Sequence, residues 1–261
     1  MSNQGKTVVI TGGSSGIGLE TARLFSKKGY RVYELSRRNC ENEGITHIGC
    51  DVSDRESVCN AVARIVDEAG RIYILVNNAG YGISGPVEMC TIESTKKMFD
   101  VNLFGAFEMV KAVIPLMRKQ QSGRIILVSS LAAEFSLPFQ VAYSASKAAL
   151  ASLSDGLRAE LKPFGIEVTC LMPGDVNTAF ARDEFISAAN IYKRLPHALE
   201  TIRQTESEGL TAGQVAADIV SIAEKRSMGV RYVSGTSYRI FRFIKRFLPD
   251  RLTNWILYKM Y

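Results

Sequence analysis

Short apolar runs rich in β-branched residues alternate along the chain with longer segments whose apolar residues recur every three or four positions. The first pattern is typical of buried strands and the second of helices that cover a sheet. The pattern predicts strands at 6–11, 31–35, 46–50, 72–76, 124–128, 166–171 and 229–233. It predicts helices at 16–28, 54–69, 94–119 and 143–162, and another that begins near Thr211.

This alternation of strands and helices indicates a parallel sheet with helices on both faces. The strands are continuously apolar, as parallel strands buried on both faces are. We therefore predict an α/β fold, a single doubly wound, Rossmann-type domain with a mostly parallel sheet of about seven strands. The stretch between Arg38 and the third strand is too short for a crossover helix, so we expect a turn there.

Composition narrows the class of protein. A chain of 261 residues with 46% hydrophobic and 22% charged residues suits one globular domain rather than a disordered chain. Neither a secretory signal nor a run of about 18 apolar residues is present, so we expect a cytoplasmic protein. Five scattered cysteines and two histidines favour free thiols over disulfides or a metal site. The net charge of +6 is concentrated near the C-terminus, and no basic face indicates nucleic-acid binding.

The segment TGGSSGIG, residues 11–18, lies between the first predicted strand and the first predicted helix. Glycines in this position let the backbone turn sharply and approach a pyrophosphate, which the free N–H groups of the helix terminus bind. We therefore expect a dinucleotide at this turn. The residues predicted to bind it are Gly12, Ser14, Ser15, Gly16, Ile17 and Gly18.

Four further motifs follow later strands in order. They are Asn77-Asn78-Ala79-Gly80, Ser130, a Tyr143-x-x-x-Lys147 pair and Pro173-Gly174. Together with the glycine turn, they resemble the short-chain dehydrogenase/reductase family over residues 6 to about 235. Within it, PFQVAYSASKAAL and LKPFGIEV resemble hydroxysteroid dehydrogenases, whereas the C-terminal tail resembles acyl-dihydroxyacetone-phosphate reductases.

The Tyr–Lys pair has a chemistry of its own. Residues four apart on a helix project from one face, so Tyr143 and Lys147 lie together. A free tyrosine has a pKa of about 10, which a neighbouring ammonium and the positive nicotinamide of the oxidised cofactor would lower. Tyr143 could then exchange a proton with the substrate oxygen, to which Ser130 donates a hydrogen bond. The resemblance adds Asn102 as a fourth catalytic residue, acting through a water, and implies that Lys147 also holds the nicotinamide ribose.

The end of the second strand indicates which dinucleotide binds. An enzyme specific for NAD usually carries an acid there, but this chain has Ser36 followed by Arg37 and Arg38. Guanidinium groups suit a 2′-phosphate, so we predict NADP(H). The resemblance implies further cofactor contacts, although Asp51 could instead cap a helix. They are Asp51, Val52, Asn78, Ala79, Gly80, Tyr143, Lys147, Pro173, Gly174, Val176 and Thr178.

Two segments point to the substrate. The resemblance implies a lid at 175–210, whose mixed apolar content, Phe180 included, favours an apolar substrate. The tail, 239–261, has an apolar stripe, flanking basic residues and a predicted break at Pro249. Such a segment suits a membrane surface or a hydrophobic mouth; the alternative is docking on the protein's own body or on a partner subunit.

We therefore predict an NADP(H)-dependent oxidoreductase that interconverts a ketone and a secondary alcohol on a lipophilic, steroid- or lipid-like substrate. The alternatives are a non-catalytic NADP(H)-binding regulator and a membrane-surface protein on the same fold. Residues 1–238 would form the catalytic domain and 239–261 a basic amphipathic tail, with peripheral membrane contact through that tail. By resemblance we expect a homodimer or homotetramer that pairs through helices 94–119 and 143–162.

Overall fold

The computed structural model describes residues 5–187 and 190–261, so positions 188–189 of the predicted lid and the first four residues lie outside it. A seven-stranded sheet in the order β11-β7-β6-β4-β1-β2-β3, parallel at every pairing, runs through its centre. This confirms the predicted fold class. The strands are β1 (Thr7–Thr11), β2 (Arg31–Ser36), β3 (Ile45–Gly49), β4 (Ile74–Asn77), β6 (Gly123–Val128), β7 (Ile166–Met172) and β11 (Arg231–Val233).

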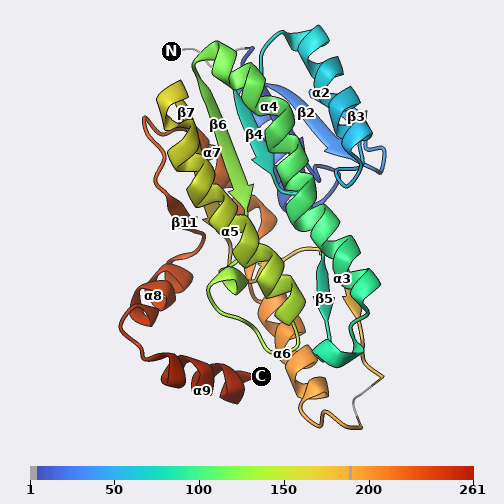
Figure 1. Ribbon diagram of the computed structural model, residues 1–261, viewed down its shortest axis with the longest axis vertical. Helices are drawn as coiled ribbons and strands as arrows, with labels where there is room; N and C mark the ends of the chain where they lie inside the picture. Colours follow the sequence, from blue (N-terminus) through green and yellow to red (C-terminus); the bar gives the residue numbers. More distant parts are fainter. Residues whose placement is uncertain (1–4, 188–189) are drawn as a thin grey trace.

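Helices cover both faces of this sheet (Figure 1). On one face α2 (Arg55–Ala69), α4 (Ala106–Gln120) and α5 (Val141–Leu161) enclose one apolar core with the strands. On the other, α1 (Gly16–Lys27) and α7 (Ala212–Glu224) enclose a second. Side-chain caps fix two of the helix starts: Asp54 accepts from the N–H of Glu56 at α2, and Thr211 forms a capping box with Gln214 at α7.

The predicted helix 94–119 is interrupted, which the sequence pattern did not show. The chain forms α3 (Ile92–Phe99), one π-helical segment (Asp100–Gly105) and then α4. The Asn102 side chain hydrogen-bonds both backbone groups of Tyr81, and Gly105 packs so closely on Val52 that a Cβ there would lie 2.8 Å from it. A wider helical turn accommodates both contacts, and such π segments are frequent at functional sites.

The predicted lid forms short elements that tie it to the body. Strand β8 (Val176–Asn177) pairs with β10 (Leu210–Thr211), and β9 (Arg182–Glu184) pairs with β5 (Gly82–Ser84). Helix α6 (Leu195–Ser207) lies between β9 and β10. Three 3₁₀ turns complete the connections: Val87–Met89, Leu131–Ala133 and Lys162–Phe164. As expected, β2 and β3 are joined by a turn rather than a helix.

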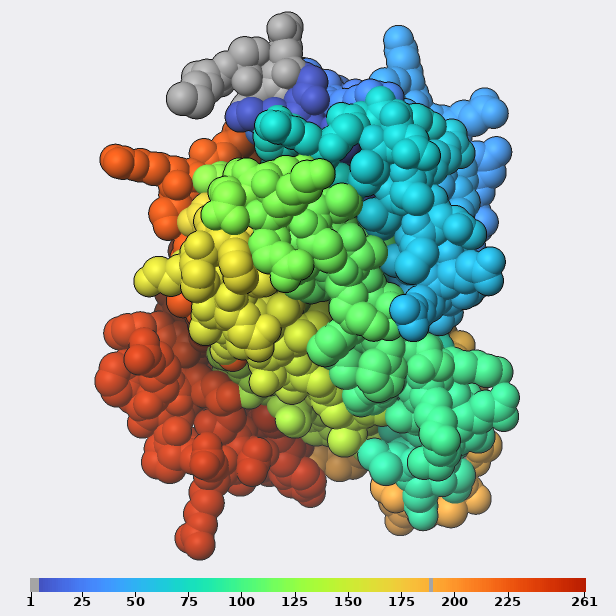
Figure 2. Space-filling model, turned by 45° about the horizontal axis from the view of Figure 1, so that its top comes forward, coloured from blue at the N-terminus to red at the C-terminus, as the bar shows by residue number. Residues whose placement is uncertain are grey.

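The tail forms two helices, α8 (Thr236–Lys245) and α9 (Asp250–Met260), which Pro249 separates as predicted. Helix α8 begins before the expected start at Arg239. The tail makes a bulge beside α5 (Figure 2), and Leu257 and Tyr261 are buried against α6. Across the described residues, no helix has the length and apolar character needed to cross a membrane.

Candidate active site

The carboxyl ends of the central strands surround a cavity of about 1090 Å³. This is where open parallel α/β sheets bind their ligands. Every residue predicted for the cofactor lines the cavity except Gly18, and every predicted catalytic residue except Asn102. Those that line it are Gly12, Ser14, Ser15, Gly16, Ile17, Ser36, Arg37, Arg38, Asp51, Val52, Asn78, Ala79, Gly80, Ser130, Tyr143, Lys147, Pro173, Gly174, Val176 and Thr178.

Hydrogen bonds between two loops shape the glycine turn. The Asn78 side-chain amide donates to the carbonyl oxygens of Thr11 (3.1 Å) and Gly12 (3.2 Å), and the Thr11 hydroxyl accepts from the N–H groups of Asn78 and Ala79. Gly12 has φ +68°, and a Cβ on Gly18 would lie 2.2 Å from the Gly12 carbonyl oxygen. Gly18 therefore supports the turn by close packing rather than by lining the cavity. Sequence reasoning missed the structural role of Thr11.

At the adenosine end of this predicted cofactor site, Arg37 and Arg38 are exposed along the cavity. Ser36 is buried and its hydroxyl lies 2.9 Å from the carbonyl oxygen of Arg38. Asp51 accepts from the N–H and hydroxyl of Ser53, whereas α2 is capped by Asp54, so the helix-cap alternative for Asp51 is wrong.

Glu34 is fully buried against the glycine turn, where a Cβ on Gly13 would lie 2.6 Å from the Glu34 Cβ, and it does not line the cavity. One of its carboxylate oxygens accepts from Ser36 and Cys40 and contacts Nδ1 of His47. The potential metal-ligating atoms of Glu34, Cys40 and His47 lie within 4.8 Å of one another, a grouping that their spacing in the sequence did not suggest. We interpret the three as a hydrogen-bonded group, since Glu34 accepts from its neighbours.

Ser130, Tyr143 and Lys147 come together at the other end of the cavity. Ser130 follows β6 and accepts from the N–H of Ala132, while α5 carries Tyr143 and Lys147 on one face. The Lys147 ammonium donates to the carbonyl oxygen of Val128 (3.0 Å) and lies 5.8 Å from the centre of the Tyr143 ring. The Ser129 hydroxyl donates to the carbonyl oxygen of Lys147 (2.8 Å), so Ser129 holds α5 in place.

Burial dominates the electrostatics of this pair. It raises the pKa of Tyr143 to about 12, against a smaller lowering by a hydrogen bond with Ser130. It lowers the pKa of Lys147 to about 8, because a buried ammonium loses its hydration. Burial therefore outweighs the effects that lower the Tyr143 pKa in this structure. The expected lowering by the ammonium together with the oxidised nicotinamide stays a prediction.

Asn102 lies behind the cavity, in the π-helical segment. Its side-chain oxygen accepts from the N–H of Tyr81 (2.9 Å), and its NH₂ group donates to the Tyr81 carbonyl (2.9 Å) and to the Ser146 hydroxyl (3.1 Å). The side chain thus joins the loop after β4 to α5. Its predicted catalytic role through a water stays a prediction.

The predicted lid contributes an aromatic and charged wall. The Phe180 ring meets the Tyr143 ring edge-on, with 5.9 Å between centroids. Arg182 and Glu206 form a bidentate ion pair that lines the cavity, as does Asp175. Sequence reasoning did not single out these three charged residues, because they meet only when β9 and α6 fold over the strand ends.

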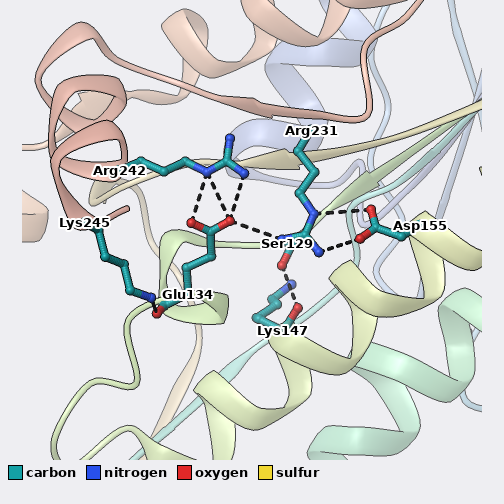
Figure 3. Close-up of polar contacts among 7 residues, drawn as sticks. All are labelled: Ser129, Glu134, Lys147, Asp155, Arg231, Arg242 and Lys245. Atoms are coloured by element: carbon teal, nitrogen blue, oxygen red, sulfur yellow. Dashed lines mark hydrogen bonds and ion pairs between the residues drawn. The ribbon is translucent and has the colours of Figure 1, made fainter. Parts of the chain in front are cut away.

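The tail is fastened to the loop that follows Ser130 (Figure 3). Arg242 donates to the carboxylate of Glu134 (3.0 Å), and Lys245 donates to the Glu134 carbonyl oxygen. Arg231 bridges the same carboxylate (3.1 Å) to Asp155 on α5 (2.6 Å). This network ties α8 to the helix that carries Tyr143.

Comparison with known proteins agrees with this arrangement. The chain is 36% identical over 264 residues, 97% of each chain, to a 3-ketodihydrosphingosine reductase of Bacteroides thetaiotaomicron. It is 31% identical over 240 residues, 85% of this chain and 72% of the relative, to dehydrogenase/reductase SDR family member 7B of Rattus norvegicus.

Solved structures show the same fold. A short-chain dehydrogenase from Streptomyces avermitilis matches with a TM-score of 0.85 at 29% identity, covering 98% of this chain and 97% of that one. A structure described as ElxO with NADP bound matches with a TM-score of 0.74 at 26% identity, covering 88% and 96%. The short chain dehydrogenase family matches residues 6–188, and the chain belongs to this family of oxidoreductases.

Proposed function

We propose that the protein is an NADP(H)-dependent oxidoreductase that interconverts a ketone and a secondary alcohol on a lipophilic substrate. The observation that carries this proposal is the convergence of Ser130, Tyr143 and Lys147 at one end of a cavity with Arg37 and Arg38 at the other. An intact set of these groups disfavours a non-catalytic regulator.

The cavity suits the dinucleotide chemically. The glycine turn lines the cavity at the N-terminus of α1, which would bind a pyrophosphate, and the exposed guanidinium groups of Arg37 and Arg38 on the same cavity would pair with a 2′-phosphate. The cofactor supplies the hydride. Lys147, with Pro173 and Gly174 across the cavity, would hold the nicotinamide end.

The chain's own residues would manage the proton. Tyr143 donates its phenolic proton to the carbonyl oxygen during reduction, and Ser130 donates a hydrogen bond to the same oxygen. The raised pKa of Tyr143 keeps this proton on the phenol at neutral pH. Lys147, on the same face of α5, would orient the reacting groups, and its ammonium keeps its positive charge below a pH of about 8.

NADPH is expected to bind more tightly than NADH. Replacing Arg37 by alanine should raise the dissociation constant of NADPH roughly tenfold or more, since a charged hydrogen bond contributes about 1.5–3 kcal/mol. NADH lacks the phosphate and should bind almost unchanged. Fluorescence titration of both cofactors measures this, and an equal loss for both would refute the role of Arg37. Arg71, a charged residue distant in sequence that does not line the cavity, offers a matched alanine control.

A long-chain lipid ketone is the substrate class that we favour over a steroid. The relative named for 3-ketodihydrosphingosine spans nearly the whole of both chains. Phe180 on the lid gives the cavity an apolar wall beside Tyr143.

We also propose that the tail contacts a membrane surface. Helix α8 is turned with its half-buried Arg242 and Lys245 towards the body and packs the Phe241 ring on Phe135, while its other large apolar side chains stay exposed. The large apolar side chains exposed on α8, α9 and the turn between them are Ile240, Phe241, Phe243, Ile244, Phe247, Leu252, Trp255, Tyr258 and Met260. Exposed Arg246, Arg251 and Lys259 beside them would attract anionic headgroups.

Binding to anionic phospholipid vesicles tests this orientation. A Phe243→Ser/Phe247→Ser double variant should lose most of its vesicle binding in a sedimentation assay, because those rings are 61% and 73% exposed. Ile92→Ser, which removes a 71% exposed side chain from α3, is the control and should bind as the wild type does. Binding should weaken as salt rises, since charges are screened over about 10 Å at 0.1 M. Unchanged binding of the double variant would exclude this surface.

The oligomeric state stays a prediction, a homodimer or homotetramer formed through α4 and α5. Small residues with exposed side chains or open space follow the outer face of α5: Ala145, Ala148, Ser152, Gly156 and Ala159. Phe107 on α4 and Phe104 in the π-helical segment before it are also exposed. Small residues allow two helices to approach closely, and the aromatic rings would add apolar contact.

A further inference from the structure

Asp175 is a carboxylate placed in the reaction cavity without a role in the chemistry described above. It directly follows Pro173-Gly174 at the end of β7 and lines the cavity together with Tyr143 and Ser130. The Tyr238 hydroxyl donates to its Oδ2 (3.1 Å), and its backbone carbonyl accepts from Leu210. Burial raises the pKa of Asp175, because its charge is largely removed from water.

The surroundings of Asp175 add negative rather than positive character. Glu206 also lines the cavity and raises the pKa of Asp175 further. Burial, with smaller contributions from Asp175, Tyr238 and Glu206, raises the pKa of Tyr261 to about 12. Among the residues described, no lysine or arginine forms an ion pair with Asp175; the nearby Arg182 is paired with Glu206.

Asp175 is half-buried, and a carboxylate that is partly removed from water is stabilised by a cation that pairs with it. Here the protein supplies only a phenol on one side, and the other side opens to the cavity that holds the reacting groups. A positively charged group on the ligand would therefore find a partner at Asp175, and the same charge would be disfavoured at the cationic adenosine end, beside Arg37 and Arg38.

The groups next to Asp175 indicate where along the substrate the positive charge would lie. Asp175 lines the same cavity as Tyr143 and Ser130, and its hydrogen-bond partner Tyr238 packs on Gly174 directly before it. The carbonyl oxygen must lie at Tyr143 and Ser130, so a cation that reaches Asp175 is attached close to the carbonyl carbon. The remaining chain of the substrate can then extend along Phe180.

We propose that Asp175 is a specificity-determining residue that binds an ammonium group on a carbon next to the ketone, so that the enzyme prefers amino ketones. The proposal rests on the ketone reduction proposed above and names its substrate class. Tyr238, on α8, is the positioning residue, since its hydroxyl holds the carboxylate; its ring also packs so closely on Gly174 that a Cβ there would lie 2.4 Å from it.

The test compares two long-chain ketones of equal length, 3-ketodihydrosphingosine, which carries an amino group next to the ketone, and its analogue without the amino group. The wild type with NADPH should have a kcat/KM about ten- to a hundredfold higher for the amino ketone, as expected for a charge-assisted hydrogen bond. Asp175→Asn, which keeps the shape and the bond to Tyr238, should bring this ratio close to one. Asp183→Asn, which removes an exposed carboxylate lining the same cavity, should keep the wild-type ratio.

Binding of the amino alcohol sphinganine to the NADP⁺-bound protein, measured by calorimetry, gives a second readout that needs no turnover. It should weaken at least tenfold in Asp175→Asn and not in Asp183→Asn. A wild-type ratio near one, an equal loss for both ketones, or unchanged sphinganine binding would overturn the proposal. If the wild type reduces neither ketone but sphinganine binding still depends on Asp175, the proposed reductase function is refuted and the ammonium site is supported.

Discussion

Replacing Tyr143 by phenylalanine is expected to lower the turnover rate on the order of 10²–10⁴-fold and to leave NADPH binding intact. Phenylalanine keeps the ring that packs edge-on against Phe180 and removes only the hydroxyl whose proton the carbonyl oxygen must receive. Steady-state kinetics with a ketone substrate and a separate NADPH titration measure the two effects independently.

Tyr81→Phe is the matched control, because Tyr81 lines the same cavity and contacts Asn102 through its backbone rather than its hydroxyl. Its turnover should stay within a few-fold of the wild type. Near-full activity of Tyr143→Phe would show that another group supplies the proton.

The expected dependence of the reduction rate on pH follows from the shifted pKa values of Tyr143 and Lys147. Tyr143, with a pKa raised to about 12, keeps its proton throughout the range in which such enzymes are assayed. Lys147, with a pKa lowered to about 8, is charged below that pH and loses its charge above it. The rate of reduction should therefore be constant below pH 8 and fall above it, because Lys147 loses its charge there. The catalytic tyrosine does not titrate in this range.

The strands and the site motifs could be predicted because their signals are local. A buried parallel strand is a short apolar run, and Ser36, Asn78, Ser130 and Pro173 each come at or just after the end of one. Since the carboxyl ends of parallel strands meet at one edge, motifs far apart in the sequence had to converge there. The cavity lining confirms this convergence.

Features that depend on distant partners could not be predicted. The apolar periodicity of the tail gives two faces of α8 but not which one is buried. Glu134 binds Arg242 and Lys245, so the basic side chains lie against the body and most of the apolar face is exposed. The same holds for Asp175, whose neighbours Glu206 and Tyr238 come from α6 and α8. The π-helical segment contains Asn102, whose side chain hydrogen-bonds to both backbone groups of Tyr81, a partner that the local sequence does not reveal.

Gly18 should be as sensitive to substitution as any residue of the cofactor site, although it does not line the cavity. A Cβ at this position would lie 2.2 Å from the Gly12 carbonyl oxygen and 2.7 Å from the Asn78 side-chain amide. Neither neighbour can yield cheaply, since one is backbone and the other holds the turn in place. Gly18→Ala should therefore push α1 away from the turn that would bind the pyrophosphate.

Helix propensity favours the alanine variant, so it acts against the expected loss of stability. Gly18 lies within α1, where alanine is favoured over glycine by about 1 kcal/mol, so any loss of stability must come from the clash. Overpacking of this kind costs about 1–3 kcal/mol. We expect Gly18→Ala to lower the free energy of unfolding and to raise the NADPH dissociation constant more than tenfold. Gly213→Ala, on α7, where a Cβ would meet only the Thr211 hydroxyl oxygen at 3.9 Å, should be neutral or stabilising and bind NADPH normally. If Gly18→Ala kept wild-type NADPH affinity, close packing at this position would not be what shapes the turn.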